Sequence, residues 1–308
     1  MVPIDEVRLA FDANVLFVLE IILGFVMFGV ALDLELDDFR HLLRSPKAPL
    51  VGLLCQFLLL PALTWALSRG LLAIGLIPPS MALGMILVAA CPGGNMSNFL
   101  THLAGGRTTT SIGMTAVSTA AAVVMTPLNI GLWGGLSPDT AAILTEVALE
   151  PIDMLRSVTL ILGVPLVAGV FVSTRLPALA AKLHPPFKWL SLLFFVSFVF
   201  MAIHANFDAF VTYLPAVFVP VAIMNALALA LGWSSAWLIG LDGPDRRAVS
   251  IEVGIQNSGL GLVLIFGFFE GLGGLALIAA WWGVWHIIAG LSLAGLWTRH
   301  DRRAAAAT

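Results

Sequence analysis

The sequence predicts an all-α polytopic membrane protein, and three features of the chain indicate this class. Apolar side chains make up 59% of the 308 residues and charged ones only 11%, whereas a soluble domain carries about 25% charged residues. The mean hydropathy is +1.00. Apolar runs also recur along the whole chain and leave no room for a soluble domain. Residues 1–308 are therefore expected to form a single membrane domain.

Nine of these runs are long enough for a transmembrane helix, because a bilayer core about 30 Å thick requires roughly 20 apolar residues. The predicted spans are residues 13–32, 48–68, 80–104, 108–134, 152–173, 188–206, 213–240, 247–269 and 273–297. Turn-forming residues mark the connections, namely Ser45-Pro46, Pro78-Pro79, Gly134-Gly135, Pro185-Pro186 and Asp242-Gly243-Pro244. Residues 33–41 are predicted to form a short amphipathic stretch at the membrane surface.

The basic residues indicate the orientation, because Lys and Arg are retained on the cytoplasmic side of a membrane. If the N-terminus lies outside, the inner segments carry Arg40, Arg44, Lys47, Arg107, Arg175, Lys182, Lys188, Arg246, Arg247, Arg299, Arg302 and Arg303. The outer side then carries only Arg8, Arg69 and Arg156. We therefore expect a multi-pass protein of the plasma (inner) membrane with its N-terminus outside and its C-terminus in the cytoplasm.

Two spans carry polar residues near their middle, where polar groups are costly and require a specific role. The third span contains residues 91–98 (CPGGNMSN), and the eighth contains residues 252–259 (EVGIQNSG). Pro92 lacks a backbone donor and the following glycines tolerate unusual dihedral angles, so the third helix should break there. Gly254 and Gly259 predict a second break in the eighth span.

The positions of the two breaks fit an inverted repeat. A first repeat of four helices would cover residues 13–134 and a second of five helices residues 152–297, each with its penultimate helix broken. A broken helix exposes carbonyl groups that can bind a cation and N–H groups that can bind an anion. Paired breaks of this kind are typical of secondary transporters. The alternative is a pair of kinked helices packed through glycine.

Several side chains near the breaks offer hard oxygen ligands for a cation such as Na⁺. Ser111 and Thr115 are four residues apart and therefore share one face of the fourth helix. Ser97 and Asn98 begin the second half of the broken third helix, and Glu252 is the one carboxylate close to a break. Taken singly, such hydroxyls more often bond to their own backbone or to a neighbouring helix. Together with the carboxylate they predict a cation site.

Other polar and aromatic residues within the spans have alternative roles that the sequence leaves open. Gln56 is expected either to reach residues 252–256 or to form an ordinary interhelical hydrogen bond. Glu20 is either a protonated carboxyl facing a cavity or a coupling residue. His204 and His286 are expected to pack rather than to act as ligands. The three tryptophans Trp281, Trp282 and Trp285 are expected either to line a cavity or to pack, and Asn129 and Asn225 are expected to bond neighbouring helices.

The two polar segments also carry a family resemblance. CPGGNMSN resembles the CPGGTASN segment of the bile acid:sodium symporter family, and EVGIQNSG resembles that family's EVGMQNSG. Three flanking segments, MFGVALDLELDDF, VGLLCQFLLLPAL and VWHIIAG, are similar to the same family and occur in the expected order. The resemblance implies the nine-helix form of the fold with two broken helices that cross. It also implies a core bundle of spans 2, 3, 4, 7, 8 and 9 and a panel bundle of spans 1, 5 and 6.

The resemblance further implies specific ligands. One sodium site would use Ser97, Asn98, Ser111, Thr115 and Glu252, and a second would use Gln56, Glu252, Gln256 and the backbone carbonyls of Val253 and Ile255. The substrate site would use Asn95, Asn257, Ser258 and His286. Two positions depart from the family pattern, because Asn95 replaces a common Thr and Ile287 replaces a common Asn. These departures leave cation coupling intact and put the recognition of bile acids in doubt.

The predicted function is a sodium-coupled symporter that imports organic anions, either bile-acid-like compounds or smaller carboxylates, by alternating access. Its partners would be the anion, sodium ions and the lipid bilayer, with no resident cofactor. A net charge of −3 without a basic patch argues against nucleic acid, and the absence of HExxH and GxSxG motifs argues against an enzyme. The alternatives are proton coupling through Glu252 and Glu20, and a non-transporting membrane protein with a binding or sensory role.

Overall fold

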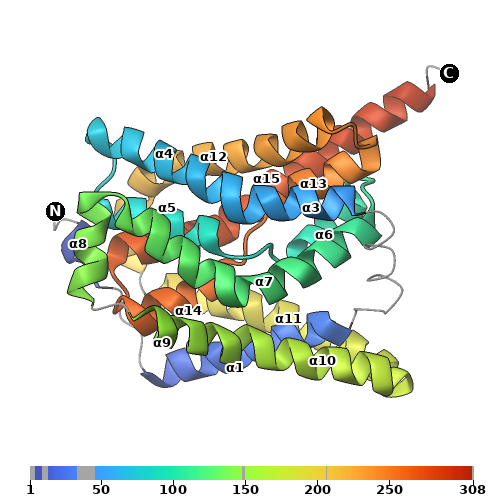
Figure 1. Ribbon diagram of the computed structural model, residues 1–308, viewed down its shortest axis with the longest axis horizontal. Coiled ribbons are helices and arrows are strands. Elements are labelled where there is room, and N and C mark those ends of the chain that lie inside the picture. Colours follow the sequence, from blue (N-terminus) through green and yellow to red (C-terminus); the bar gives the residue numbers. More distant parts are fainter. Residues whose placement is uncertain (1–3, 9–12, 33–45, 148–149, 206, 307–308) are drawn as a thin grey trace.

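The computed structural model describes residues 4–8, 13–32, 46–147, 150–205 and 207–306 (Figure 1). Within these ranges the regular elements are helices, joined by turns and by two isolated β-bridges. This confirms the predicted all-α class. The predicted amphipathic stretch at residues 33–41 lies outside the described residues.

The helices follow the predicted spans closely in most of the described chain. They are α1 (Ala13–Leu32), α3 (Lys47–Leu54), α4 (Leu60–Ala73), α5 (Pro79–Ala90), α6 (Met96–Leu103), α7 (Thr108–Gly135), α8 (Pro138–Glu146), α9 (Pro151–Val158), α10 (Val164–Arg175), α11 (Pro177–Ala205), α12 (Phe207–Leu238), α13 (Gly243–Gly254), α14 (Ser258–Phe268) and α15 (Gly273–Ala306). A π-helical turn at Cys55–Leu59 joins α3 to α4, and another at Thr159–Gly163 joins α9 to α10.

Five helices in the described residues are long and apolar enough to cross a membrane by length and composition. They are Lys47–Ala73, Thr108–Gly135, Ile152–Arg175, Val211–Leu238 and Gly273–Ala306. Shorter apolar helices cover Glu20–Gly29, Pro79–Ala90 and Ser258–Phe268. The last two are halves of helices that are broken in the middle, which explains why they fall below the length of a full span.

The helices pack into two groups (Figure 1). The panel bundle consists of α1, α9, α10 and α11, in which α1 packs against both α10 and α11. The core bundle consists of α3 to α7 and α12 to α15. Contacts of α1 with α14 and of α7 with α9 join the two bundles. This division agrees with the core and panel bundles expected from the sequence.

The two broken helices cross at their breaks, inside the core bundle. The chain is extended between α5 and α6 and again between α13 and α14, and the two extended segments pair as an antiparallel bridge between Gly93 and Gln256. The Gly94 N–H donates to the Ile255 carbonyl at 2.7 Å, and the Asn257 N–H donates to the Pro92 carbonyl at 2.9 Å. The crossing thereby satisfies backbone groups that a broken helix leaves unpaired in a membrane.

The backbones approach so closely at this point that a side chain does not fit. A Cβ at Gly94 would lie 2.9 Å from the carbonyl oxygen of Gln256. Side chains from other helices bind the last carbonyls of the two first halves. Thr126 Oγ1 donates to the Ala90 carbonyl at 2.7 Å, and Asn225 Nδ2 donates to the Gly254 carbonyl at 2.7 Å. The predicted role of Asn225 in bonding a neighbouring helix is therefore confirmed.

Two connections differ from the prediction. Pro185 and Pro186 were expected in a connection before a span at residues 188–206, but α11 begins at Pro177 and continues through both prolines. A proline inside a helix removes a hydrogen bond. Packing against α1 offsets this loss, because the ring of Phe187 stacks on Phe25 at 5.5 Å and lies 5.2 Å from Phe28. The connection after Gly134-Gly135 also contains a short helix, α8.

Candidate functional site

The carboxylate of Glu252 lies at the end of α13, beside the crossing, and is only 2% exposed. Three hydroxyl groups surround it. Ser97 Oγ donates to Glu252 Oε2 at 2.6 Å, Thr115 Oγ1 lies 2.9 Å from Oε1, and Ser111 Oγ lies 3.3 Å from Oε2. Ser97 comes from α6, whereas Ser111 and Thr115 share one face of α7 as predicted.

Asn98 completes this cluster from α6. Its Oδ1 accepts from Ser111 Oγ at 2.8 Å and from Thr115 Oγ1 at 3.2 Å. The structure thus brings together all five residues predicted for the first site. One further hydroxyl belongs to this cluster and was not predicted: Thr101 Oγ1 lies 3.3 Å from Ser111 Oγ. Its spacing of four residues from Ser97, which places both on one face of α6, was the available signal.

The cluster contains more acceptor oxygens than hydroxyl hydrogens can satisfy. A hydroxyl carries a single hydrogen, yet four acceptor oxygens lie within 3.2 Å of Thr115 Oγ1: Asn98 Oδ1, the Ser111 carbonyl and both oxygens of Glu252. In the described part of the chain, no Lys, Arg or His forms an ion pair with Glu252. A buried carboxylate without a counter-charge is costly, so this geometry favours a bound cation or a proton.

Gly93 makes room for this carboxylate, and sequence reasoning used it only as part of the break. A Cβ added to Gly93 would collide with Oε1 of Glu252 and would lie 2.8 Å from its carboxyl carbon. The glycine therefore has two functions: it permits the extended crossing segment, and it leaves space for the charged group.

A second polar cluster lies around Gln56, on the π-helical turn that ends α3. Its Nε2 donates to the Gln256 side-chain oxygen at 2.7 Å and to the Cys91 carbonyl at 2.7 Å. The expectation that Gln56 reaches residues 252–256 is therefore confirmed. Gln256 Nε2 in turn donates to the Val253 carbonyl at 2.7 Å. Within the described residues no hydrogen bond joins Glu252 to either glutamine, so the two clusters are neighbours on α13 rather than one network.

The four residues expected at the substrate site lie around the crossing and on α15. Asn95 directly precedes α6, and its buried Oδ1 has no hydrogen-bond partner in the described residues. Asn257 precedes α14, and its Oδ1 accepts from the Leu260 N–H at 3.0 Å, so this side chain also caps the helix. Ser258 is buried against Gly283 of α15, where a Cβ would lie 2.8 Å from its Oγ.

His286 lies one turn beyond Gly283 on α15 and is 3% exposed. Its ring meets that of Trp282 edge-on with 6.4 Å between centroids, and its Nδ1 has no partner among the described residues. By contrast, Trp285 packs on Phe218 of α12 at 5.1 Å. Glu20 is exposed on α1, away from the buried cluster at Glu252.

Comparison with known proteins identifies the chain. A family model described as the Sodium Bile acid symporter family matches residues 20–213, which is more than half of the sequence. This chain belongs to the sodium bile acid symporter family. The expectation from the two polar segments is therefore confirmed, and the chain is a multi-pass membrane protein from a family of sodium-dependent transporters.

Relatives in this family come from bacteria, plants and mammals. The chain is 33% identical over 287 residues to "Uncharacterized sodium-dependent transporter YocS" of Bacillus subtilis (strain 168), covering 92% of this chain and 84% of the relative. It is 32% identical over 278 residues to "Probable sodium/metabolite cotransporter BASS1, chloroplastic" of Arabidopsis thaliana, covering 90% and 66%. It is also 32% identical over 235 residues to "P3 protein" of Mus musculus, covering 75% and 47%. The names of the first two relatives describe transport that depends on sodium.

Proposed function

We propose that the protein is a sodium-coupled symporter that imports organic anions by alternating access. The observation that carries this proposal is the buried carboxylate of Glu252, which is surrounded by hydroxyl and amide oxygens at the crossing of two broken helices. Sodium is a hard cation that takes oxygen ligands, and the excess of acceptor oxygens around Thr115 Oγ1 is the pattern that such an ion would satisfy.

Two sodium ions fit this proposal. The first site uses the cluster around Glu252: Ser97, Asn98, Ser111, Thr115 and Glu252. The second uses Glu252 with Gln56, Gln256 and the carbonyls of Val253 and Ile255. Those carbonyls already accept hydrogen bonds from Gln256 Nε2 and the Gly94 N–H, and the second lone pair of each remains for an ion. Sodium at both sites would tie α13 to α6, α7 and the turn at Gln56.

The anion would bind at the crossing itself. Both second halves, α6 and α14, begin there, and helix N-termini favour anions through free N–H groups and the helix dipole. The unpartnered Asn95 Oδ1 and His286 Nδ1 and the amide of Asn257 lie around the same region. Sodium would order the crossing and thereby fix these N–H groups for a carboxylate or sulfonate, which couples the two substrates.

The proposed orientation is in the plasma (inner) membrane with the N-terminus outside. In this orientation the inward sodium gradient and the membrane potential would supply the energy for import. Two sodium ions that enter with one monovalent anion carry net positive charge inward, and each charge is worth about 2.3 kcal/mol per 100 mV of membrane potential. Movement of the core bundle against the panel bundle would expose the crossing to each side in turn. The proposed substrate is defined by its acidic group, so it includes both bile-acid-like compounds and smaller carboxylates.

The test is uptake of a panel of radiolabelled carboxylates and sulfonates into proteoliposomes that contain the purified protein. An inward sodium gradient should accumulate at least one of these anions above its equilibrium level, and replacing sodium by potassium should remove the accumulation. Accumulation that follows a pH gradient without sodium would instead favour the proton-coupled alternative. Saturable binding without flux would contradict transport altogether.

The hydroxyls of α7 should contribute to sodium affinity. We expect Ser111→Ala and Thr115→Ala each to raise the sodium concentration for half-maximal uptake about three- to tenfold, since each removes one oxygen contact to the ion. Thr119→Ala is the matched control, because Thr119 lies one turn further along the same helix and its Oγ1 has no hydrogen-bond partner in the described residues. Wild-type sodium curves in both Ser111→Ala and Thr115→Ala would mean that these hydroxyls only pack.

The proposed orientation makes a separate prediction. A cysteine replacing Glu146 at the end of α8 should react with an impermeant thiol reagent on intact cells, whereas one replacing Gly243 should react only after permeabilisation. Both positions are exposed, and a Cβ at Gly243 meets nothing within 4 Å. The background replaces Cys55 and Cys91, which are both buried. The opposite labelling pattern would reverse the orientation and the direction of import.

A further inference from the structure

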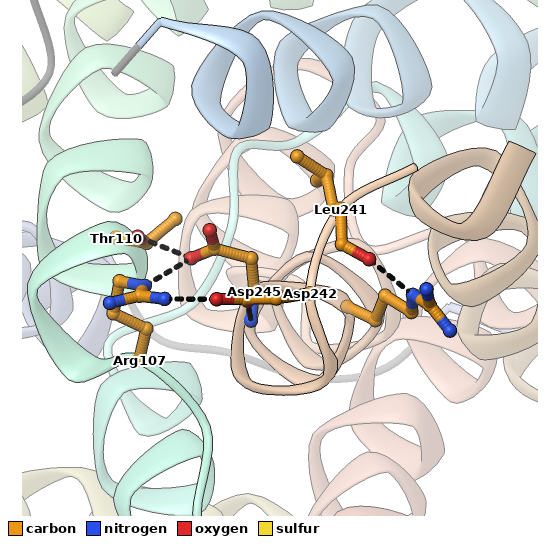
Figure 2. A network of polar contacts seen from close by, with 6 residues as sticks. Arg107, Thr110, Leu241, Asp242 and Asp245 are labelled. Atoms are coloured by element: carbon orange, nitrogen blue, oxygen red, sulfur yellow. Dashed lines mark hydrogen bonds and ion pairs between the residues drawn. The ribbon is translucent and has the colours of Figure 1, made fainter. Parts of the chain in front are cut away.

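Two of the helices that carry the proposed sodium ligands, α7 and α13, are joined by polar contacts at the end of the core bundle where both begin (Figure 2). We call this the basic end; it contains residues 104–107 and 240–247. Arg107 immediately precedes α7, and its backbone N–H donates to the Pro244 carbonyl of α13 at 3.1 Å. Its guanidinium Nε donates to Asp245 Oδ1 at 2.7 Å, and its Nη2 donates to Asp242. Thr110 Oγ1 donates to the same oxygen of Asp245 at 2.9 Å.

The two aspartates also belong to the start of α13. Asp242 caps that helix, because its Oδ1 accepts from the Asp245 N–H at 2.9 Å while its other oxygen binds Arg107. The hydrogen bond with Asp245 is the largest of the effects that raise the pKa of Arg107 above its ordinary value, so the guanidinium stays charged. The first turns of α7 and α13 are therefore joined by a backbone bond and by a charged network that includes Asp242, the N-cap residue of α13.

This junction determines the axial register of the two helices at Glu252. Both begin at the basic end, and α-helices rise about 1.5 Å per residue. By that rise Thr115 lies about 10 Å beyond the start of α7, and Glu252 lies about 14 Å beyond the start of α13. A slip of one helix by a single residue would move Thr115 Oγ1, now 2.9 Å from Glu252 Oε1, by about 1.5 Å, and would distort this contact.

A second arginine fixes α6 in the same way. Arg247 Nη1 donates to the carbonyl of Ala104, the C-cap residue of α6, at 2.7 Å. Its two terminal nitrogens bind both oxygens of Asp301 on α15 at 2.6 and 2.7 Å, and its guanidinium lies 5.6 Å from the centre of the Trp297 ring. Since α6 carries Ser97, the position of Arg247 on α13 fixes that ligand relative to Glu252.

We propose that Arg107 and Arg247 are positioning residues that set the affinity of the first sodium site by fixing the register of α6, α7 and α13. This inference rests on the proposed sodium-coupled function. The arginines act through the helices and not by contact with the ion. The side chain of Arg107 is 38% exposed, and exposed ion pairs contribute little to stability. For Arg107 the expected effect is therefore on sodium affinity rather than on folding. The side chain of Arg247 is only 15% exposed, so the folding of its variant is measured alongside its sodium titration.

The test is a sodium titration of the purified full-length protein, with tracer sodium as the probe and choline as the replacement ion. Arg107→Gln and Arg247→Gln should each raise the half-saturating sodium concentration about tenfold or more. Arg69→Gln is the matched control. It breaks an exposed ion pair of 3.2 Å with Asp139 that joins α4 to α8, and it should leave the titration unchanged.

Rescue separates positioning from a general loss of structure. Arg107→Lys keeps a positive charge beside Asp242 and Asp245 and should retain clearly more sodium affinity than Arg107→Gln. If Arg107→Gln does not fold, Thr110→Val removes one bond to Asp245 without changing any charge and should shift the titration in the same direction by a smaller factor. The effects of Thr110→Val and Thr115→Ala should also be non-additive, because both act on the same contact.

A parallel titration of Glu252→Gln separates this inference from the proposed function. If Glu252→Gln loses sodium binding while the Arg107, Arg247 and Thr110 variants keep the wild-type curve, the positioning role is wrong and the sodium site stands. If Glu252→Gln binds sodium as the wild type does, both proposals are overturned. Sodium affinity lowered in Glu252→Gln and in the arginine variants, but not in Arg69→Gln, supports both.

Discussion

Replacing Glu252 by alanine should abolish sodium-driven anion uptake. This carboxylate supplies the charge for both proposed ion sites, and it accepts from hydroxyls on two other helices at distances of 2.6 and 2.9 Å. Removing one partner of a buried charged contact costs about 3–5 kcal/mol, so sodium affinity should fall by at least about 100-fold. Uptake of a transported anion into proteoliposomes at increasing sodium concentration measures the effect.

Two further variants isolate the charge. Glu252→Gln keeps the shape of the side chain and its acceptor oxygen, so it should lose sodium-driven uptake almost as fully as the alanine variant. Glu20→Gln removes the other carboxyl considered for coupling, and it should behave as wild type because Glu20 is exposed on α1. Normal uptake with an unchanged sodium dependence in Glu252→Ala would contradict the assignment of both ion sites.

Gly93→Ala should lower sodium affinity almost as much. It adds only one methyl group, at a position whose neighbours along the chain are uncharged. The new Cβ would collide with Oε1 of Glu252 and lie 2.8 Å from the carboxyl carbon. The carboxylate must then move away from Ser97 and Thr115, or the crossing segments must separate. Overpacking of this kind costs about 1–3 kcal/mol, which corresponds to a loss of sodium affinity of roughly 5- to 150-fold.

Gly131→Ala on α7 is the matched control, because a Cβ at that position meets nothing within 4 Å. It should leave uptake unchanged. The yield and the monodispersity of both purified variants in detergent report whether they fold. A folded Gly93→Ala protein with wild-type sodium affinity would mean that Glu252 does not have to occupy its present position for sodium to bind.

Local chemistry made the two breaks and one face of the site predictable from the sequence. Pro92 and the glycines after it cannot continue a helix without loss of hydrogen bonds, and the structure breaks α5 from α6 at that point. Ser111 and Thr115 share a face because of helical periodicity alone. By contrast, the contact of Ser97 with Glu252 joins residues 155 positions apart. The oxygen chemistry of the residues near the two breaks and the family resemblance indicated that pairing, and no helical spacing did.

Other features depend on tertiary contacts that leave no local pattern. Thr126 binds the free carbonyl at the end of α5, but a threonine in an apolar helix is equally typical of simple packing. The pair Pro185-Pro186 has the composition of a turn, and its place inside α11 follows from the packing of Phe187 on α1. The basic residues predicted an orientation, whereas the bonds of Arg107 to Asp242 and Asp245 became visible only in the fold.

The inverted repeat remains a proposal, and the crossing supports it. Each broken helix is followed by one long helix, α7 after α6 and α15 after α14. The two extended segments pair in antiparallel orientation at Gly93 and Gln256, as two copies of a unit inserted in opposite directions would. The two polar clusters, by contrast, do not repeat, because both draw on the end of α13.

Reciprocal flux tests most directly whether sodium and the anion are transported together at this site. Proteoliposomes with a clamped membrane potential are given an inward gradient of a transported anion, and the entry of tracer sodium is followed in the wild type and in Glu252→Gln. Coupled transport predicts that the anion gradient drives sodium into wild-type vesicles above the level reached without anion, and that Glu252→Gln shows no such entry. Anion entry that leaves the sodium flux unchanged in wild-type vesicles would contradict sodium coupling.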